Sequence, residues 1–369
     1  MTSADARPPS VALVHDYLTQ RGGAERVVVS MLKAFPCAPL HTSFYEPERT
    51  FPEFRSADVR PLPIARAPLL GRHHRLALPL LATAFSRLEL DADAVVCSSS
   101  GWAHGARVSG SKIVYCHAPA RWLYQPDRYL GRRRPLARAA LAALRPALAR
   151  WDRRAAAGAD TYLANSRAVR DLIRSLYGIE AEVLHPPSGL DASGPQQRVT
   201  RLEPGFFLCV ARLLPYKNVD SIVTAFESLP GEQLAVVGVG PDSRRLRSLA
   251  PANVRFLGEV SAEELRWLYA SCTGVVAAAY EDFGLTPVEA ASFGKPSAAL
   301  RFGGFLDTIV EDVTGLLFEE PSPTEVRDAV RKLGSKRWDP ATLVAHADRF
   351  SESAFVSRLR MVVAAAARG

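Results

Sequence analysis

Several classes of protein are excluded by what this 369-residue sequence lacks. Its five cysteines are scattered and odd in number, and no CxxC pair occurs, so we expect neither a disulfide framework nor a zinc site. It has no run of about 18 apolar residues, so no membrane-spanning helix is expected. The polar stretch 1–10 lacks the apolar core of a signal peptide. These features favour a reduced, cytoplasmic setting, and an apolar content of 48% supports full cores.

The excess of positive over negative charge lies entirely in the first half of the chain. Residues 1–200 carry 27 Lys and Arg against 17 Asp and Glu, whereas residues 201–369 carry 19 against 21. This asymmetry indicates an anionic partner for the first half, either a membrane lipid, a phosphorylated substrate or nucleic acid.

Short apolar strands alternate with helical stretches twice along the chain. This pattern predicts an α/β fold with two parallel-sheet domains. The turn-forming stretch 186–195 is interpreted as an interdomain linker. The expected domains are therefore 1–195 and 196–350, followed by a C-terminal helix within 351–369 that crosses back to the first domain.

Two carboxylates, Glu281 and Glu289, flank a glycine-containing loop in the second half. An apolar strand precedes Glu281, and a helix is expected to begin at Thr286–Pro287. Both carboxylates would then face the crevice at the carboxyl edge of a sheet, where open α/β folds bind ligands and helix amides suit a phosphate. Alternatively, Thr286 and Glu289 form a capping box with Pro287 in the first helical position. Capping does not explain Glu281.

Two cations, Arg212 and Lys217, follow the first strand of the second half. With standard strand order they reach the same edge as Glu281. Two cations and two carboxylates suit a nucleotide diphosphate sugar, because the cations neutralise the diphosphate and the carboxylates bind hydroxyls. Glycine turns at Gly22–Gly23 and at Gly238 would allow close backbone approach to a ligand, although such turns often serve only backbone geometry.

Taken together, these motifs resemble the retaining family 4 nucleotide-sugar glycosyltransferases. That family has the GT-B fold, in which two Rossmann-like domains face a central cleft. The resemblance covers nearly the whole chain and rests on the segments 22–25, 115–119, 164–166, 185–187, 210–217, 238–241 and 281–296.

The resemblance implies roles for particular residues of the second domain. Arg212 and Lys217 would bind the donor diphosphate and stabilise the leaving group. Glu289 would bind the ribose, and Glu281 the donor sugar. The pocket for phosphate and sugar would be lined by Gly238 and by the amides of Phe283, Gly284 and Leu285.

In the first domain, the resemblance places Gly22 and Gly23 against the diphosphate and His117 beside the anomeric centre. The segments 98–105 and 116–124 look closest to the O-antigen-type mannosyltransferase branch. This implies GDP-mannose as donor and a lipid-linked or other glycan acceptor in cell-envelope polysaccharide or glycolipid synthesis. The segments 295–299 and 303–307 depart from the family pattern, which puts the donor sugar in doubt.

The reaction implied is hexosyl transfer with retention of anomeric configuration, without a metal or other cofactor. Asp91-Ala-Asp93 matches the DxD pattern of metal–diphosphate sites. It precedes a strand, however, which is the wrong end for ligands. We therefore interpret it as structural.

A basic segment, residues 131–154, contains eight arginines and a single acid, Asp152, with interleaved leucines. It resembles an amphipathic surface for an anionic membrane, which would make the protein peripheral on the inner face of the plasma membrane. Pro146 would kink this segment. The alternative is a surface helix whose apolar side lies in the core.

Other functions remain open at this point. A GT-B-fold epimerase or glycosyl phosphorylase would share the architecture, although no pyridoxal-binding lysine is identified. A basic protein that binds nucleic acid or membrane without catalysis is the non-enzymatic alternative. The sequence contains no recognisable nucleic-acid module, so no nucleic-acid partner is expected.

Overall fold

The computed structural model describes residues 9–66, 78–125 and 135–368. The chain divides into two units, Met1–Pro187 with Glu352–Gly369, and Ser188–Ser351. The division therefore falls at Pro187 instead of residue 195. Hydrogen bonds to backbone carbonyls explain the difference, because Ser188 N donates to Phe350 O (2.9 Å) and the Arg266 guanidinium donates to Asp191 O (2.7 Å). These bonds tie the start of the expected linker to the second unit.

Unit 1 contains a parallel sheet whose strand order, in the described residues, is β3-β2-β1-β5-β7-β8-β9. Its strands are β1 (Val11–His15), β2 (Leu40–Thr42), β3 (Val59–Pro61), β5 (Ala94–Ser99), β7 (Ser111–Cys116), β8 (Thr161–Ala164) and β9 (Glu182–Val183), with a separate pair β4 (Glu89–Leu90) and β6 (Arg107–Val108). Its α-helices are α1 (Gly23–Ala34), α3 (Leu78–Ser86), α4 (Arg121–Tyr124), α6 (Pro135–Ala157), α7 (Arg167–Tyr177) and α15 (Glu352–Ala366).

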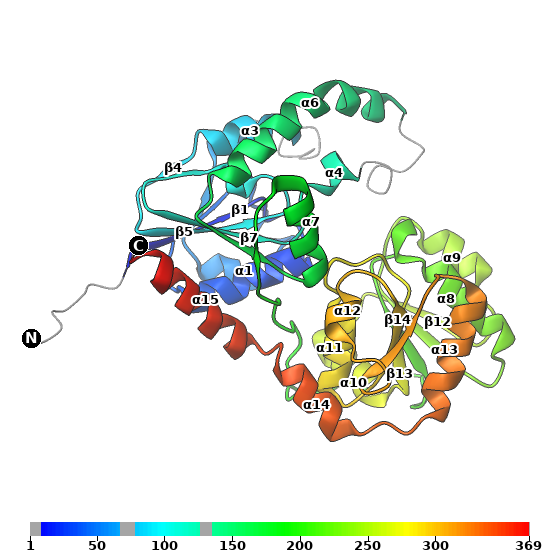
Figure 1. Cartoon of the computed structure of the whole chain (residues 1–369). Helices are drawn as coiled ribbons and strands as arrows, with labels where there is room; N and C mark the ends of the chain where they lie inside the picture. Colours follow the sequence, from blue (N-terminus) through cyan, green and yellow to red (C-terminus); the bar gives the residue numbers. More distant parts are fainter. Residues whose placement is uncertain (1–8, 67–77, 126–134, 369) are drawn as a thin grey trace, which may run out of the picture. The chain divides into compact units, whose positions relative to one another are not determined.

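Helices cover both faces of this sheet (Figure 1), which explains why β5 is buried along its whole length. One face packs on α1 and α15, through residues such as Met31 and Leu359. The other packs on α3, α4, α6 and α7.

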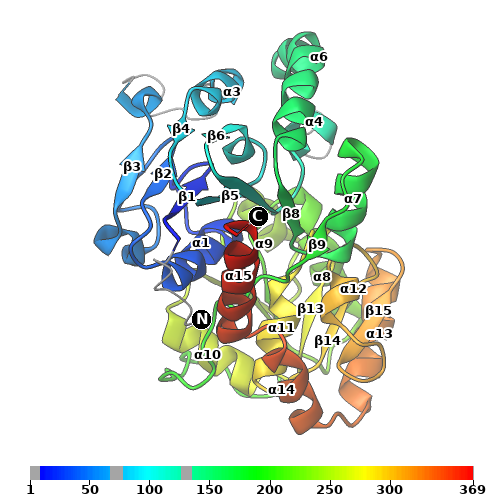
Figure 2. The ribbon, with the colours of Figure 1, turned by 60° about the vertical axis from the view of Figure 1, so that its left-hand side comes forward.

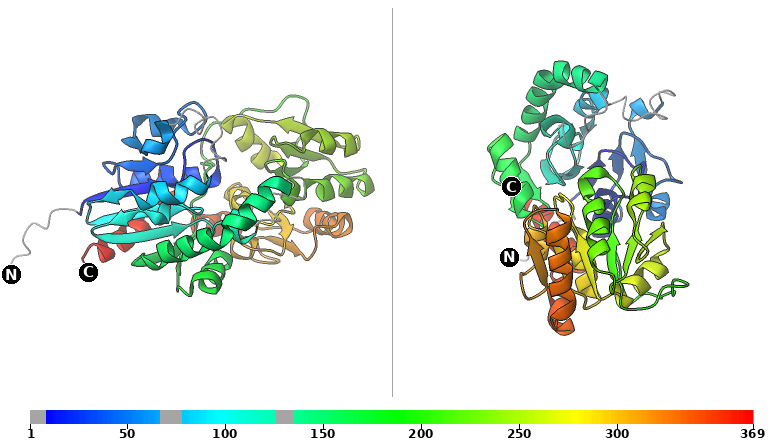
Figure 3. Two further views of the ribbon diagram at one scale, coloured as in Figure 1. Left: turned by 90° about the horizontal axis from the view of Figure 1, so that it is seen from above. Right: turned by 90° about the vertical axis from the view of Figure 1, so that its right-hand side faces the viewer.

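The last helix of the chain belongs to unit 1. Figure 2 shows α15 beside α1, and Ser30 Oγ donates to Glu352 Oε1 (2.7 Å). At the far end of α15, Ser111 Oγ donates to Ala366 O (2.8 Å), so this helix, red in Figure 3, ends near the start of β7. Residues far apart in sequence thus complete one core.

Unit 2 contains a parallel sheet with the order β12-β11-β10-β13-β14-β15. Its strands are β10 (Phe207–Val210), β11 (Leu234–Val237), β12 (Val254–Gly258), β13 (Gly274–Ala277), β14 (Ser297–Leu300) and β15 (Gly315–Phe318). Its helices are α8 (Val219–Ala225), α9 (Ser243–Leu249), α10 (Ala262–Ser271), α11 (Leu285–Ser292), α12 (Phe305–Thr308), α13 (Pro323–Ser335) and α14 (Pro340–Asp348). When the six strands are numbered from 1 to 6 along the chain, their order in the sheet is 3-2-1-4-5-6, the strand order of dinucleotide-binding folds.

In both units the strand order reverses next to the first strand, between β1 and β5 and between β10 and β13. Ligands of doubly wound sheets bind outside the carboxyl ends of the strands at such a switch point. The two parallel sheets confirm the predicted α/β fold of two Rossmann-like domains. The fold therefore marks one candidate ligand position in each unit.

The helix after Glu281 differs from the sequence prediction. It begins at Leu285, with Gly284 in the N-cap position, so Thr286 is a helical residue and not the cap of a capping box. A capping box does occur in unit 2, between Ser261 and Glu264 of α10. The glycine at position 284 changes the start of the helix because it adopts a left-handed conformation (φ 81°).

Four cysteines are buried and Cys37 is exposed, and none is in a disulfide. Among the described helices, none has the length and apolar composition required to cross a membrane.

Candidate active site

The switch point of unit 2 is occupied by an ion pair between Lys217 and Glu281. Lys217 ends the short 3-10 helix Pro215–Lys217 after β10, and Glu281 follows β13. Two backbone-directed bonds join the same loops, from Tyr280 N to Tyr216 O (3.3 Å) and from Asn218 Nδ2 to Ala278 O (2.8 Å). These bonds hold the two loops together and so bring the two charged side chains within reach of each other.

This ion pair lies at the boundary of protein and solvent. The Lys217 side chain is 12% exposed and that of Glu281 is 24% exposed. Both line a cavity of about 20 Å³ with Thr286 and the ends of β10 and β13. Arg212, in the same loop as Lys217, is exposed. The loop after β10 thus carries one largely buried cation, Lys217, and one exposed cation, Arg212.

Glu289 lies on α11 and accepts a hydrogen bond from Tyr269 Oη at 2.6 Å. Tyr269 is fully buried on α10 and stacks on Phe293 with ring centroids 5.6 Å apart. Burial, and then the nearby Glu289 carboxylate, raise the pKa of Tyr269 well above its usual range, so the phenol stays a donor. The tyrosine therefore holds one oxygen of Glu289 in a fixed direction.

Two glycines shape the backbone at this edge. Gly238, after β11, has φ 126°, and a Cβ there would collide with the Ala211 carbonyl after β10. Gly284 precedes α11, and a Cβ there would enter the Phe305 ring. Because Phe283 is buried, the segment 283–285 presents mainly backbone at the start of α11.

The carboxyl edge of unit 1 contains a hydrogen-bonded chain of two histidines and a serine. Ser98 Oγ at the end of β5 lies 2.8 Å from His117 Nε2 and 3.0 Å from His15 Nδ1. These three residues follow or end β5, β7 and β1, so they surround the switch point of this sheet. Asn165 Nδ2 also donates to the His117 carbonyl (2.8 Å).

Burial, and then the neighbouring His15, lower the pKa of His117 to about 3. The imidazole is therefore neutral at pH 7. One ring nitrogen is engaged by Ser98, so the other is the one that can meet a ligand. A neutral, fixed ring can hydrogen-bond a sugar hydroxyl but carries no charge.

Gly22 and Gly23 form the start of α1, with Gly22 as its N-cap. The buried Glu25 carboxylate folds back against Gly22, where a Cβ would meet it. Gln20 Nε2 donates to Glu25 Oε1 (3.0 Å), and burial raises the pKa of Glu25. A side chain at position 22 would therefore have to displace the Glu25 carboxylate.

The DxD-like residues serve a turn at the opposite edge of unit 1. Asp93 Oδ2 accepts from Ser10 N and Oγ (2.7 and 2.8 Å), and Asp91 Oδ1 accepts from Ser109 Oγ (2.7 Å). Within residues 9–66, 78–125 and 135–368, no group of three His, Cys, Asp or Glu residues has the arrangement of a metal site.

The structure thus gathers the expected site residues into two sets. Unit 2 brings together Arg212, Lys217, Gly238, Glu281, the segment 283–285 and Glu289 at one edge, and unit 1 brings Gly22, Gly23 and His117 to the carboxyl edge of its own sheet. Sequence reasoning missed Tyr269, Ser98 and His15. His15 ends a buried strand, and this position is a signal in the sequence that could have identified it as a site residue. Nothing in the local sequence distinguishes Tyr269 from an ordinary core residue.

Asp16 is a further residue that sequence reasoning missed. Its buried carboxylate accepts hydrogen bonds from the backbone amides of Ser100, Trp102 and Ala103, at 2.6, 3.1 and 2.6 Å. These bonds fix the loop after β5 against the end of β1. The serine and the two histidines thereby gain a rigid support.

Two family models match the chain. "Glycosyltransferase Family 4" matches residues 21–192, and "Glycosyl transferases group 1" matches residues 194–354. The two matches meet between residues 192 and 194, close to the division between the units.

Curated relatives are mannosyltransferases, among others. One relative is the GDP-mannose-dependent alpha-(1-6)-phosphatidylinositol monomannoside mannosyltransferase of Mycobacterium tuberculosis, which is 30% identical. The match covers 49% of this chain and 54% of that protein, so the chain spans about half of the relative's length. The human alpha-1,3/1,6-mannosyltransferase ALG2 is 28% identical over 95% of this chain and 94% of its own length.

Solved structures share the fold over nearly the full length. Anabaena HepE, solved with UDP-glucose, has a TM-score of 0.70 at 17% identity and covers 96% of this chain and 100% of its own. Sucrose-phosphate synthase of Thermosynechococcus elongatus has a TM-score of 0.67 at 18% identity, with coverage of 95% and 97%. The solved structures show the GT-B fold, and the two family models, which together match residues 21–192 and 194–354, show that the chain belongs to the family 4 glycosyltransferases.

Proposed function

We propose that this protein transfers a hexose from a nucleotide diphosphate sugar to a lipid-linked or other glycan acceptor, with retention of anomeric configuration. The observation that carries the proposal is the Lys217–Glu281 pair across the switch point of unit 2. A cation at this position suits the diphosphate, and a carboxylate beside it suits sugar hydroxyls.

The existing ion pair is compatible with donor binding. An ammonium has three N–H donors, so Lys217 can keep its bond to Glu281 and give another to a phosphate oxygen. Arg212 is exposed in the same loop and adds a second positive charge as the leaving diphosphate develops negative charge. Glu281 in turn keeps its second oxygen for the sugar.

The ribose is assigned to Glu289. Tyr269 engages one of its oxygens, which orients the carboxylate for a pair of adjacent hydroxyls. On the acceptor side, the neutral His117 ring would contact the sugar near the anomeric carbon. Catalysis then consists of positioning and charge stabilisation, and no metal or other cofactor is required in this proposal.

GDP-mannose is the proposed donor, with a role in cell-envelope polysaccharide or glycolipid synthesis. The support is the naming of two relatives as mannosyltransferases, one of them GDP-mannose-dependent and acting on a phosphatidylinositol mannoside. UDP-glucose is the main competitor, since HepE was solved with it. Hydrolysis and transfer assays with GDP-mannose, UDP-glucose, UDP-galactose and UDP-N-acetylglucosamine test the choice. Turnover of a UDP-sugar with none of GDP-mannose contradicts it.

We also propose a cytoplasmic, peripheral position on the inner face of the plasma membrane. Of the basic segment 131–154, residues 131–134 lie outside the described residues. In the described part of α6, Leu148 is buried in the core and Trp151 packs on Trp102 and His104, so this part of the apolar side is already covered. Exposed arginines of α6 such as Arg145 and Arg153 remain available for electrostatic binding. Equal sedimentation with anionic and neutral vesicles at low salt contradicts this part of the proposal.

A further inference from the structure

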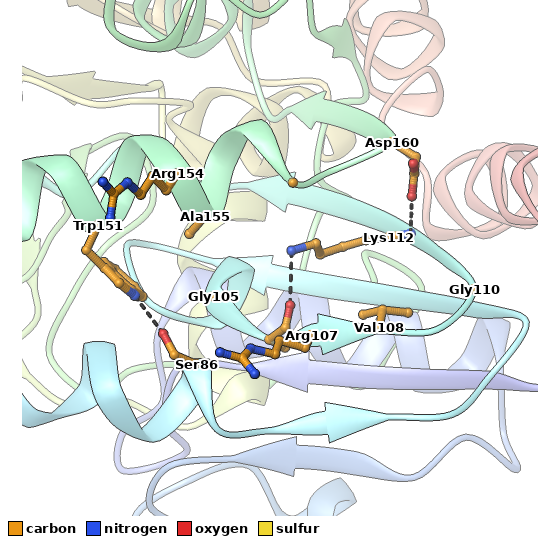
Figure 4. Close-up of a pocket in the computed structure, with 12 residues that line it drawn as sticks. Ser86, Gly105, Arg107, Val108, Gly110, Lys112, Trp151, Arg154, Ala155 and Asp160 are labelled. Carbon is orange, nitrogen blue, oxygen red and sulfur yellow. Dashed lines mark hydrogen bonds between the residues drawn. The ribbon is translucent and has the colours of Figure 1, made fainter.

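A second cavity lies in unit 1 at the edge opposite His117. It has a volume of about 490 Å³ and opens between the C-terminal part of α6, β6 and the start of β7 (Figure 4). Lys112 is the second residue of β7, whereas His117 follows its last residue, so the cavity is at the amino edge of the sheet. The proposed reaction uses none of its lining residues.

The floor of the cavity contains a buried cation. Lys112 is 8% exposed, and Figure 4 shows its side chain extending between α6 and the β6 segment. Its Nζ donates to the carbonyls of His104 (3.2 Å) and Ala106 (3.0 Å). Two of the three ammonium donors are thereby used, and one remains for a ligand.

This buried ammonium has no carboxylate partner among the described side chains. The nearby Asp160 uses its Oδ2 to accept from the backbone N–H of Lys112 at 2.7 Å. Burial lowers the pKa of Lys112, against smaller opposing effects of Cys97 and Asp160. A charge buried without a counter-ion is costly, so an anion that enters the cavity gains the interaction that the chain does not supply.

Two arginines add positive charge to the cavity wall. Arg154 on α6 is exposed and has no acidic partner in the described part of the chain. Arg107 on β6 is paired with Glu89 at 3.2 Å, but both side chains are largely exposed, so this pair is weak and exchangeable. Against these cations the lining contributes a single acid, Asp160.

The wall is also rigid. Trp151 Nε1 donates to Ser86 Oγ at 2.7 Å, which joins α6 to the end of α3. The tilted Trp151 and His104 rings pack with centroids 5.5 Å apart. The positions of Arg154 and Lys112 are therefore set by packed elements and not by a mobile loop.

We propose that this cavity binds the phosphate group of a ligand at a site separate from the donor site. Lys112 contributes its remaining N–H at the floor, and the Arg107 and Arg154 guanidinium groups of the lining add positive charge that attracts the phosphate. The volume exceeds that of a single phosphate, so the cavity has room for a further part of the ligand. The phosphate can belong to a soluble phosphorylated metabolite or to a phospholipid headgroup.

The direct test measures inorganic phosphate binding to the full-length protein by calorimetry. The Arg212→Ala/Lys217→Ala double variant removes the donor-site cations and should keep this binding. Arg154→Gln should weaken it on the order of tenfold, because one charge-assisted hydrogen bond is lost. Arg150→Gln is the matched control, since it removes the same charge from an exposed position of α6 outside the cavity lining. Lys112→Met should weaken binding further.

Because Lys112→Met changes a buried residue, thermal unfolding is recorded for every variant, and Arg154→Gln alone is sufficient to decide. Vesicles of phosphatidylglycerol and of phosphatidylcholine then distinguish the two sources. A headgroup ligand predicts that Arg154→Gln reduces sedimentation with phosphatidylglycerol more than Arg150→Gln does. A soluble ligand predicts equal sedimentation but weaker phosphate binding in Arg154→Gln. Equal behaviour of the two variants in both assays, or loss of phosphate binding in the double variant, overturns the proposal.

Discussion

The Lys217 ammonium contacts the Glu281 carboxylate at the point where the strand order of unit 2 reverses. A partly buried ion pair contributes little to stability by itself, because desolvation offsets the attraction between its charges. The pair lies where doubly wound sheets usually bind their ligands, which indicates a role in ligand binding.

Lys217→Ala and Arg212→Ala should each reduce turnover on the order of 100-fold. The loss of one hydrogen-bond donor to the leaving diphosphate typically raises the transition-state free energy by about 2.7–4 kcal/mol. Steady-state rates at saturating donor measure this. Lys332→Ala is the control, since that lysine is an exposed surface residue of α13 paired with Asp312 at 3.4 Å. Near-normal turnover in Lys217→Ala would remove the proposed role.

Tyr269→Phe should raise the donor KM about tenfold with a smaller effect on kcat. The substitution removes the 2.6 Å hydrogen bond that orients Glu289, while the ring and its packing remain. Separate measurement of KM and kcat distinguishes this from a general loss of structure. Phe293→Leu changes the stacked neighbour but keeps the phenol, so a comparable rise in KM there would argue for packing instead.

Gly238→Ala should destabilise the protein more than Gly205→Ala. Both glycines have positive φ, 126° and 103°, so each alanine costs about 1–2 kcal/mol in backbone strain. Only at Gly238 does the new methyl group meet a backbone carbonyl, that of Ala211, whereas nothing lies near the Cβ position of Gly205. An additional cost of about 1–3 kcal/mol is expected from the overlap. Chemical denaturation gives both values, and equal losses would show that the contact is relieved.

His117 should make the wild-type protein lose stability as the pH falls. Its pKa is about 3 in the folded protein and about 6.5 in the unfolded chain, so below about pH 6.5 the unfolded state binds a proton that the folded state does not. The contribution is present above pH 6.5 and declines by up to about 1.4 kcal/mol per pH unit below it. His117→Gln should therefore show a shallower fall in unfolding free energy between pH 7 and pH 5.

Other histidines also contribute to the pH dependence of the unfolding free energy. Burial also lowers the pKa values of His41 and His346, so some pH dependence persists in the variant. Parallel curves for wild type and His117→Gln would contradict the assigned protonation state.

Turnover should be unchanged by EDTA, because Arg212 and Lys217 are proposed to provide the positive charge that a metal ion supplies in other transferases. Rates are measured after extensive chelation and again after addition of Mg²⁺ or Mn²⁺. Activity that is lost on chelation and restored by either ion contradicts this prediction.

The fold, and the placement of many site candidates at one edge of a sheet, follow from sequence because periodicity and chain order are local signals. Arg212, Lys217 and Glu281 each follow a buried strand, and parallel strands bring their carboxyl ends to one edge. The start of α11 was mispredicted because the left-handed Gly284 overrides the Thr286–Glu289 capping pattern. Side-chain partners such as Tyr269 for Glu289, or Ser98 between His15 and His117, depend on packing between distant elements and have no local signal.

The most direct test of the central claim is the anomeric configuration of the product. Purified protein is incubated with α-linked GDP-mannose and a lipid-linked glycan acceptor, and the new linkage is read by NMR. We predict an α-mannoside, formed at least on the order of 100-fold more slowly by Lys217→Ala. A β-linked product, or transfer that is independent of Lys217, would contradict the account.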